Sequence, residues 1–205
     1  MLDWTIFLVE TSAHHLHIEY VNYVKVAKDS MSLHSQQSTS VSVKDLLLKL
    51  NQILNDKGLT VGFAESCTGG LLSSELTKIP GVSQVFKGSV VCYANELKER
   101  LLGVDPVTLQ KFGAVSKEVA IQMVMGAKRN LSVDVAASIT GIAGPDGGSA
   151  MKPVGTVFIA VVGGKNEAEV FHHQFSKETT RESIQKAAME KTLEHLIEIL
   201  GQIKD

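Results

Sequence analysis

The sequence is short of several features that define common protein classes. It has 2 cysteines, Cys67 and Cys92, in 205 residues, which is too few for a disulfide framework and favours a cytoplasmic protein. No apolar run reaches the length of a membrane span, and the N-terminus lacks the pattern of a signal peptide. No CxxC or HExxH metal motif occurs, and the net charge of -2 offers no electrostatic basis for binding nucleic acid. We therefore expect no metal or other cofactor, and neither a membrane nor a nucleic acid as a partner.

Two common phosphate-binding patterns are also missing. The sequence contains neither the GxxxxGK[ST] motif of a P-loop nor a GxGxxG motif with a downstream acid, as in a Rossmann dinucleotide site. Glycines instead stand directly after predicted strands, at 69–70 and at 141–148. Any nucleotide site must therefore be of another kind.

The composition predicts one globular domain with an addition at its N-terminus. Hydrophobic residues make up 44% of the chain and charged residues 20%, an ordinary mixture for a globular protein. Residues 1–42 differ, because they hold four of the 7 histidines and end in a stretch rich in Ser, Gln and Thr. We predict a flexible extension and linker at 1–42, followed by the domain at 43–205.

Helical and strand patterns alternate along this domain. Apolar residues at helical spacing alternate with short β-branched runs, and the last two runs are joined by a Gly-Gly turn. This order predicts an α/β fold, a three-layer α/β/α sandwich with a mixed, mostly parallel sheet and a C-terminal hairpin and helix. We expect helices at about 43–54, 69–78, 95–102, 106–112, 116–130 and 180–200, and strands at about 59–64, 85–93, 133–139, 155–162 and 170–175.

The first turn between a strand and a helix offers several reactive side chains. The strand stops at Glu65, and the helix begins after Gly69 and Gly70. Three small polar residues lie between them, and each could equally serve as a nucleophile or a phosphate ligand: Ser66, Cys67 and Thr68. The N–H groups of a helix start suit an oxyanion, so Gly69 and Gly70 are candidate donors, while Glu65 can orient these N–H groups or a lysine. The alternative is an ordinary turn in which Thr68 is the N-cap.

Two further stretches also follow strands, and the carboxyl ends of strands form the ligand-binding edge of an open α/β sheet. Thr140 and Gly141 open a long glycine-bearing loop that can offer a hydroxyl and N–H groups, unless it is a surface loop. Tyr93 and Asn95 leave another strand, and Lys98 lies one helical turn further on. A buried Lys98 would lose proton affinity and could act as a base, although a surface lysine fits the pattern equally well.

Together these stretches resemble the CinA C-terminal domain family in order and spacing. The resemblance covers about residues 43–200. The stretches that carry it are Ala64-Glu65-Ser66-Cys67-Thr68-Gly69-Gly70, Tyr93-Ala94-Asn95-Glu96-Leu97-Lys98, Gly113-Ala114-Val115-Ser116, residues 140–148 and Lys152-Pro153-Val154-Gly155-Thr156-Val157.

The resemblance implies a nicotinamide-nucleotide amidase. Such an enzyme hydrolyses the carboxamide of nicotinamide mononucleotide to nicotinic acid mononucleotide and ammonia, in pyridine nucleotide salvage. It implies Ser66 as the nucleophile, Lys98 as its base and Tyr93 beside them, in a stand-alone amidase that forms homo-oligomers. The candidate substrate-binding residues are Glu65, Thr68, Gly69, Gly70, Asn95, Thr140, Gly141 and Arg181.

The sequence departs from the family pattern at one position and leaves alternatives open. The family commonly has two arginines four residues apart near the last helix; Arg181 fits the first, but Gln185 stands at the second, and Lys186 could replace only its charge. Cys67 is a rival nucleophile, because a helix start can acidify a thiol. The alternative functions are a non-catalytic nucleotide-binding regulatory module and an amidohydrolase of another small amide.

Overall fold

The computed structural model describes residues 41–164, 167–176 and 178–203. The predicted extension and linker lie outside these residues, except for Val41 and Ser42. Ser42 caps the first helix, because its hydroxyl accepts the N–H of Asp45 at 3.2 Å, and that helix begins at Val43.

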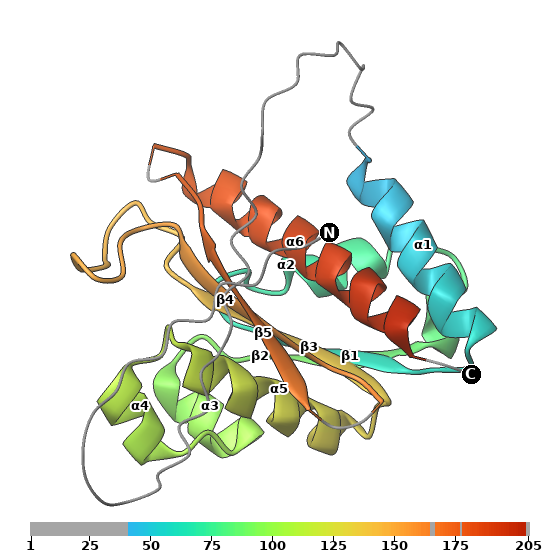
Figure 1. Cartoon of the computed structure of the whole chain (residues 1–205), viewed down its shortest axis with the longest axis horizontal. Helices are drawn as coiled ribbons and strands as arrows, with labels where there is room; N and C mark the ends of the chain where they lie inside the picture. The colour runs from blue at the N-terminus through green and yellow to red at the C-terminus, as the bar shows by residue number, and fades with distance from the viewer. Residues whose placement is uncertain (1–40, 165–166, 177, 204–205) are drawn as a thin grey trace, which may run out of the picture. The chain divides into compact units, whose positions relative to one another are not determined.

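Five strands form one open sheet in the order β2-β1-β3-β4-β5 (Figure 1). Neighbours β2, β1 and β3 are parallel, whereas β4 is antiparallel to both β3 and β5. In this sheet β4 therefore runs against the other four strands, which confirms the predicted mixed sheet and C-terminal hairpin. The strands are β1 Val61–Glu65, β2 Phe86–Val91, β3 Val135–Gly141, β4 Thr156–Val162 and β5 Ala168–Gln174.

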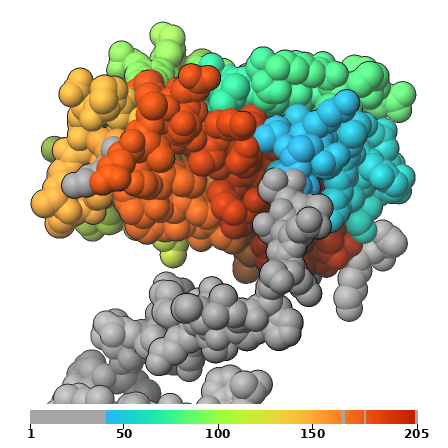
Figure 2. All heavy atoms as spheres, turned by 90° about the horizontal axis from the view of Figure 1, so that it is seen from above, coloured from blue at the N-terminus to red at the C-terminus, as the bar shows by residue number. Residues whose placement is uncertain are grey.

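Helices cover both faces of the sheet and confirm the three-layer α/β/α fold. Figure 1 shows α1, α2 and α6 on one face and α3, α4 and α5 on the other, and Figure 2 shows α1 and α6 side by side at the surface. The helices are α1 Val43–Asp56, α2 Leu71–Leu76, α3 Asn95–Leu102, α4 Pro106–Phe112, α5 Lys117–Leu131 and α6 Arg181–Gln202, with a short 3-10 turn, η1, at Val82–Gln84.

The two faces of the sheet differ in the size of their side chains. Along β3, Val135 and Ile139 face α1 and α6, whereas Ala136 faces α5. Small residues let α5 lie close to its neighbours: a Cβ on Gly126 would stand 2.0 Å from the carbonyl oxygen of Leu102. This close contact fixes the C-terminal end of α3, the helix that carries Lys98.

The turn after β1 differs from its predicted form. Gly69 and Gly70 have φ angles of 63° and 98°, in the left-handed region, so α2 starts at Leu71 and ends earlier than expected. Thr68 is not the N-cap, because its hydroxyl donates to the Glu65 carboxylate at 2.8 Å. The prediction of an ordinary turn capped by Thr68 is therefore wrong.

The carboxylate of Glu65 takes the capping role instead. It is fully buried and accepts the N–H groups of Gly70, Leu72 and Ser73, at 3.1, 3.2 and 3.0 Å. The hydroxyls of Thr68 and Ser73 also donate to it. One carboxylate thus neutralises the positive end of a six-residue helix and joins that helix to the end of β1.

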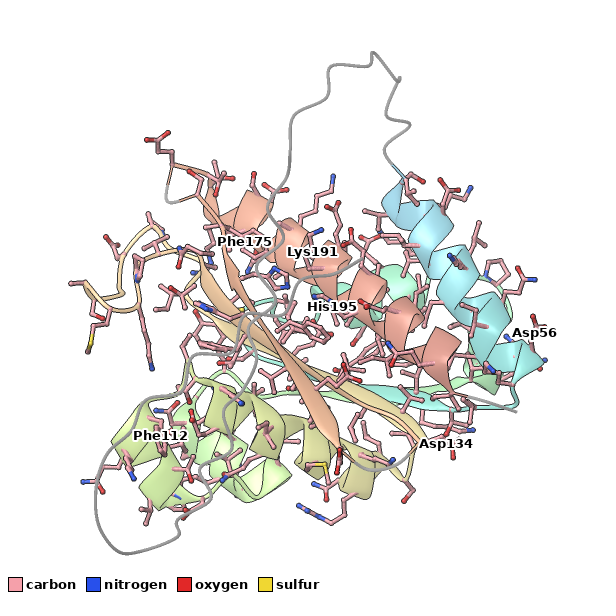
Figure 3. The ribbon with its side chains drawn as sticks, in the orientation of Figure 1. Asp56, Phe112, Asp134, Phe175, Lys191 and His195 are labelled. Atoms are coloured by element: carbon pink, nitrogen blue, oxygen red, sulfur yellow. The ribbon has the colours of Figure 1, made fainter. Side chains whose placement is uncertain are left out.

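A pair of histidines joins β5 to α6. The Nε2 atoms of His173 and His195 lie 2.9 Å apart, and His195 stacks on Phe171 with ring centroids 3.5 Å apart. Figure 3 shows His195 and Lys191 on α6 beside β5. Burial lowers the pKa of His173 to about 4, and it lowers the pKa of His195 too. One ring must donate and the other accept, so at least one ring is neutral, and the lowered pKa values favour the neutral form of both.

We predict that replacing Glu65 by Gln destabilises the domain. The amide places an N–H group among donors that need an acceptor, so the free energy of unfolding should fall by about 3 kcal/mol. The matched control is Glu75→Gln on the same helix, where Glu75 forms an exposed pair with Lys78 and the loss should stay below about 1 kcal/mol. Urea unfolding of the two variants measures the difference; equal losses would contradict the capping role.

We also predict that acid destabilises the histidine pair. An unfolded chain protonates these histidines near pH 6.5, whereas folding lowers the pKa of His173 to about 4, so stability falls as pH falls through this window. His173→Gln should shrink the loss of stability between about pH 7.5 and about pH 5. His172→Gln, on the opposite face of β5, should keep the parent's loss in urea titrations; a parent protein equally stable at both pH values would refute the effect.

Candidate active site

The carboxyl ends of β1, β2 and β3 meet at one edge of the sheet and enclose a cavity of about 260 Å³. This is the arrangement that the strand order predicts for an open α/β sheet. The cavity brings together seven of the eleven predicted site residues: Ser66, Tyr93, Asn95, Lys98, Thr140, Gly141 and Arg181. The other four, Glu65, Thr68, Gly69 and Gly70, do not line it.

At the base of this cavity Lys98 lies next to Ser66. The distance between Lys98 Nζ and Ser66 Oγ is 3.1 Å. Lys98 is only 1% exposed, and burial lowers the pKa of its amine. Its Nζ also donates to the carbonyl oxygens of Cys92 at 3.0 Å and Tyr93 at 3.1 Å. Nζ thus has three oxygen partners, and the lowered pKa favours the neutral amine, whose lone pair can accept the Ser66 hydroxyl.

Backbone hydrogen bonds between the strand ends set this geometry. The N–H of Ser66 donates to Ile139 O at 3.1 Å, and the N–H of Cys92 donates to Glu65 O at 2.8 Å. The nucleophile candidate is thus bound to β3, and the carbonyls that receive Lys98 follow directly on β2. The helix α3 starts at Asn95, so its first turn returns Lys98 to the sheet edge.

Cys67 is unsuited to the rival role of nucleophile. Its side chain is 4% exposed, and burial raises the pKa of its thiol to about 12. The thiol is therefore protonated at neutral pH, and the expectation that the helix start acidifies it is wrong. A Cβ on Gly141 would stand 2.7 Å from Val157 Cγ2 and 2.9 Å from Thr156 O, so the pairing of β3 with β4 beside Cys67 needs a glycine at 141.

The glycines of the turn do not offer free donors to an oxyanion. The N–H of Gly69 donates to Ser66 O at 3.0 Å, and that of Gly70 donates to Glu65. The prediction of an oxyanion site at Gly69 and Gly70 is therefore wrong. Within the described ranges, the N–H groups of Cys67 and Thr68 have no acceptor on another residue, so they remain as donor candidates beside Ser66.

Arg181 holds the rim of the cavity together. Its guanidinium donates to Gly144 O at 2.7 Å and to Tyr93 Oη at 2.8 Å. Tyr93 is 63% exposed, so its side chain lies at the rim, while its backbone carbonyl binds Lys98. The hydroxyl of Thr140 donates to Ala114 O at 2.8 Å, which leaves its oxygen lone pairs as acceptors.

A second, larger cavity of about 630 Å³ lies behind the same turn, between α2 and α6. Thr68, Gly69 and Gly70 line this second cavity, together with Gln185 and Lys186. Gln185 Nε2 donates to Cys67 O at 2.8 Å, a contact that sequence reasoning missed. The only sequence signal at this position was its departure from the family's arginine.

The described residues hold neither a cluster of metal ligands nor a helix able to span a membrane. Between residues 41 and 203, outside the gaps at 165–166 and 177, no three His, Cys, Asp or Glu side chains gather closely enough to hold a metal ion. Over the same part of the chain, no helix has the length and apolar character that a membrane crossing requires.

Comparisons with known proteins place this site in a family. The family model of the CinA C-terminal domain matches residues 43–200. A CinA-like protein of Prochlorococcus marinus (strain MIT 9515) is 44% identical over 162 residues, which are 79% of this chain and 36% of that protein. One from Fervidobacterium nodosum is 49% identical over 146 residues, 70% of this chain and 34% of that protein. The chain thus spans little more than a third of these relatives.

Solved structures agree with the fold, and the match includes almost the whole of each of those chains. The competence/damage inducible protein CihA from Agrobacterium tumefaciens is 38% identical with a TM-score of 0.75, covering 84% of this chain and 100% of its own. A CinA superfamily protein from Enterobacter cloacae is 32% identical with a TM-score of 0.76, covering 83% of this chain and 99% of its own. With the family model matched from α1 to α6, the chain belongs to the CinA C-terminal domain family.

Proposed function

We propose that the chain hydrolyses the carboxamide of nicotinamide mononucleotide to nicotinic acid mononucleotide and ammonia. The observation that carries this proposal is the buried Lys98 amine 3.1 Å from the Ser66 hydroxyl. A serine beside a neutral lysine is an arrangement for acyl transfer without a metal. The substrate itself rests on the family resemblance, because a serine–lysine pair does not select an amide.

The proposed reaction starts with proton transfer from Ser66 to Lys98. The Ser66 oxygen attacks the carboxamide carbon and forms a tetrahedral intermediate, while the new ammonium of Lys98 stays bound to the Cys92 and Tyr93 carbonyls. Lys98 then gives its proton to the leaving nitrogen, and ammonia departs as the acyl-enzyme forms. In the second half of the reaction Lys98 takes a proton from water, and the water oxygen attacks the acyl ester. Lys98 then gives this proton to the departing Ser66 oxygen.

The backbone offers donors for the negative oxygen of this intermediate. The N–H groups of Cys67 and Thr68 follow the nucleophile directly, and the turn's own hydrogen bonds do not use them. Each donor of this type lowers the barrier by about 3 kcal/mol. Their effect is largest in a site that excludes water, as the burial of Ser66 and Lys98 indicates.

The cavity and its rim bind different parts of the proposed substrate. The volume of about 260 Å³ is near the lower end of ligand pockets, about 300–1,000 Å³, so it holds the reacting end of a small molecule. The rest of the substrate extends over the rim, where Arg181 has N–H groups beyond the two that Gly144 and Tyr93 accept. These groups suit an anionic group such as a phosphate.

We predict ammonia release from nicotinamide mononucleotide by the pure protein in the presence of a metal chelator. Ser66→Ala should lower the rate by at least about 1,000-fold, because removing the nucleophile removes the covalent route. Cys67→Ala, next to it in the turn, should stay within about tenfold of the parent, since a protonated thiol does not attack. Full activity in Ser66→Ala would contradict the serine mechanism.

The same assay separates the alternatives. Binding of the nucleotide in calorimetry without turnover would instead support a non-catalytic regulatory module. Turnover of other small amides, with none of nicotinamide mononucleotide, would keep the Ser66–Lys98 pair and replace the substrate.

We predict that the activity follows the ionisation of Lys98. Only the neutral amine accepts the Ser66 proton, so kcat/KM should fall as pH falls through the pKa of Lys98, which burial places below its usual 10.5. Lys98→Met should lower kcat by at least about 100-fold. Lys78→Met changes an exposed lysine just after α2 and should leave the pH profile unchanged. A Lys98→Met enzyme with the parent's profile would show that another group is the base.

A further inference from the structure

The side chain of Gln185 reaches the nucleophile turn from the opposite side. It projects from α6, lines the cavity of about 630 Å³ and does not line the cavity that holds Ser66 and Lys98. Its Nε2 donates to Cys67 O at 2.8 Å, across 118 residues of sequence. Any effect on the reaction must therefore pass through the turn, since Gln185 does not contact the site of the reacting atoms.

The contact fixes the plane of the Cys67–Thr68 peptide. A trans peptide is planar, and its C=O and N–H point in opposite directions. Because the Cys67 carbonyl points toward Gln185 on α6, the N–H of Thr68 points away from that helix. No residue of the described ranges accepts this N–H, so the hydrogen bond to Gln185 sets its direction.

The other hydrogen bonds of the turn do not use the C=O or the N–H of this peptide. The carbonyl of Ser66 accepts the N–H of Gly69, the hydroxyl of Thr68 donates to Glu65, and the carbonyl of Thr68 accepts the N–H of Leu71. Gln185 thus supplies the restraint that these bonds do not give to the residue after the nucleophile.

We propose that Gln185 is a positioning residue that holds the Cys67–Thr68 peptide, and with it the turn that carries Ser66, in the arrangement needed for attack. This inference rests on the proposed acyl-transfer function. It assigns to α6 a direct part in the geometry of the nucleophile turn, although α6 covers the opposite side of that turn. The effect concerns the transition state, so it should appear in kcat and not in KM.

Replacement of Gln185 by Met tests this assignment. The variant keeps the length of the side chain and loses the donor, so kcat for nicotinamide mononucleotide should fall by about 10- to 100-fold while KM stays within about twofold. Gln185→Glu, which turns a carboxylate toward the Cys67 carbonyl, should fall at least as far, and Gln185→Lys, which restores an N–H donor, should recover most of the loss. The acidic limb of the pH profile should stay in place in all three, because Lys98 is untouched.

Glu182→Gln is the matched control, one turn earlier on α6 and on the wall of the same cavity. It should retain the parent's kcat, and thermal melts should show that all variants are folded. A Gln185→Met enzyme with the parent's kcat overturns the assignment, and so does an equal loss in Glu182→Gln.

A separate readout covers failure of the proposed substrate. If the parent protein releases no ammonia from nicotinamide mononucleotide, the proposed function fails, and acylation of Ser66 by p-nitrophenyl acetate, followed by intact mass, becomes the test. Slower acylation in Gln185→Met than in Glu182→Gln supports the positioning role. Equal rates in the two variants, including no acylation in either, overturn it.

Discussion

The burial of one lysine amine is the constraint on which the rest of the site depends. A charged ammonium that is 1% exposed costs free energy, so burial lowers the pKa of Lys98, whose Nζ has two carbonyl oxygens and a serine hydroxyl around it. Those three partners come from the ends of two different strands, and the lysine comes from the helix that follows one of them. The close contact of α5 with Leu102 keeps that helix in place, so the packing on one face of the sheet sets the proton affinity at its edge.

The turn after β1 separates structural tasks from chemical ones. The Glu65 carboxylate accepts the N–H groups at the start of α2, so these groups stabilise the turn and are not available to a ligand. Ser66 remains on the other side, facing Lys98. A carboxylate at the end of a buried strand therefore makes a rigid support for the turn that carries the nucleophile candidate.

Much of this could be predicted from local patterns, and the failures share a cause. The strand and helix order, the sheet edge and the approach of residues 66, 98 and 140 follow from periodicity and chain direction, because parallel strands present the same end. The pattern around Lys98, with Glu99 and Arg100 beside it, equally fits a solvent-facing helix; only the packing of α3 decides its burial. The contact of Gln185 with Cys67 has no local signature, because it joins residues 118 positions apart through the packing of α6.

The reversed direction of β4 has a consequence for how the cavity can vary. A parallel strand after β3 would need a crossover that carries the chain away from the site, whereas the antiparallel β4 starts where β3 ends. The segment between them, residues 142–155, therefore leaves the cavity and returns to it, and Figure 1 shows it projecting beyond the sheet. Ala143 and Val154 anchor the two ends of this loop to the core, so changes of length between them can reshape the entrance without altering strand register. The fold thus lets the entrance of the cavity vary in a segment that lies outside the sheet.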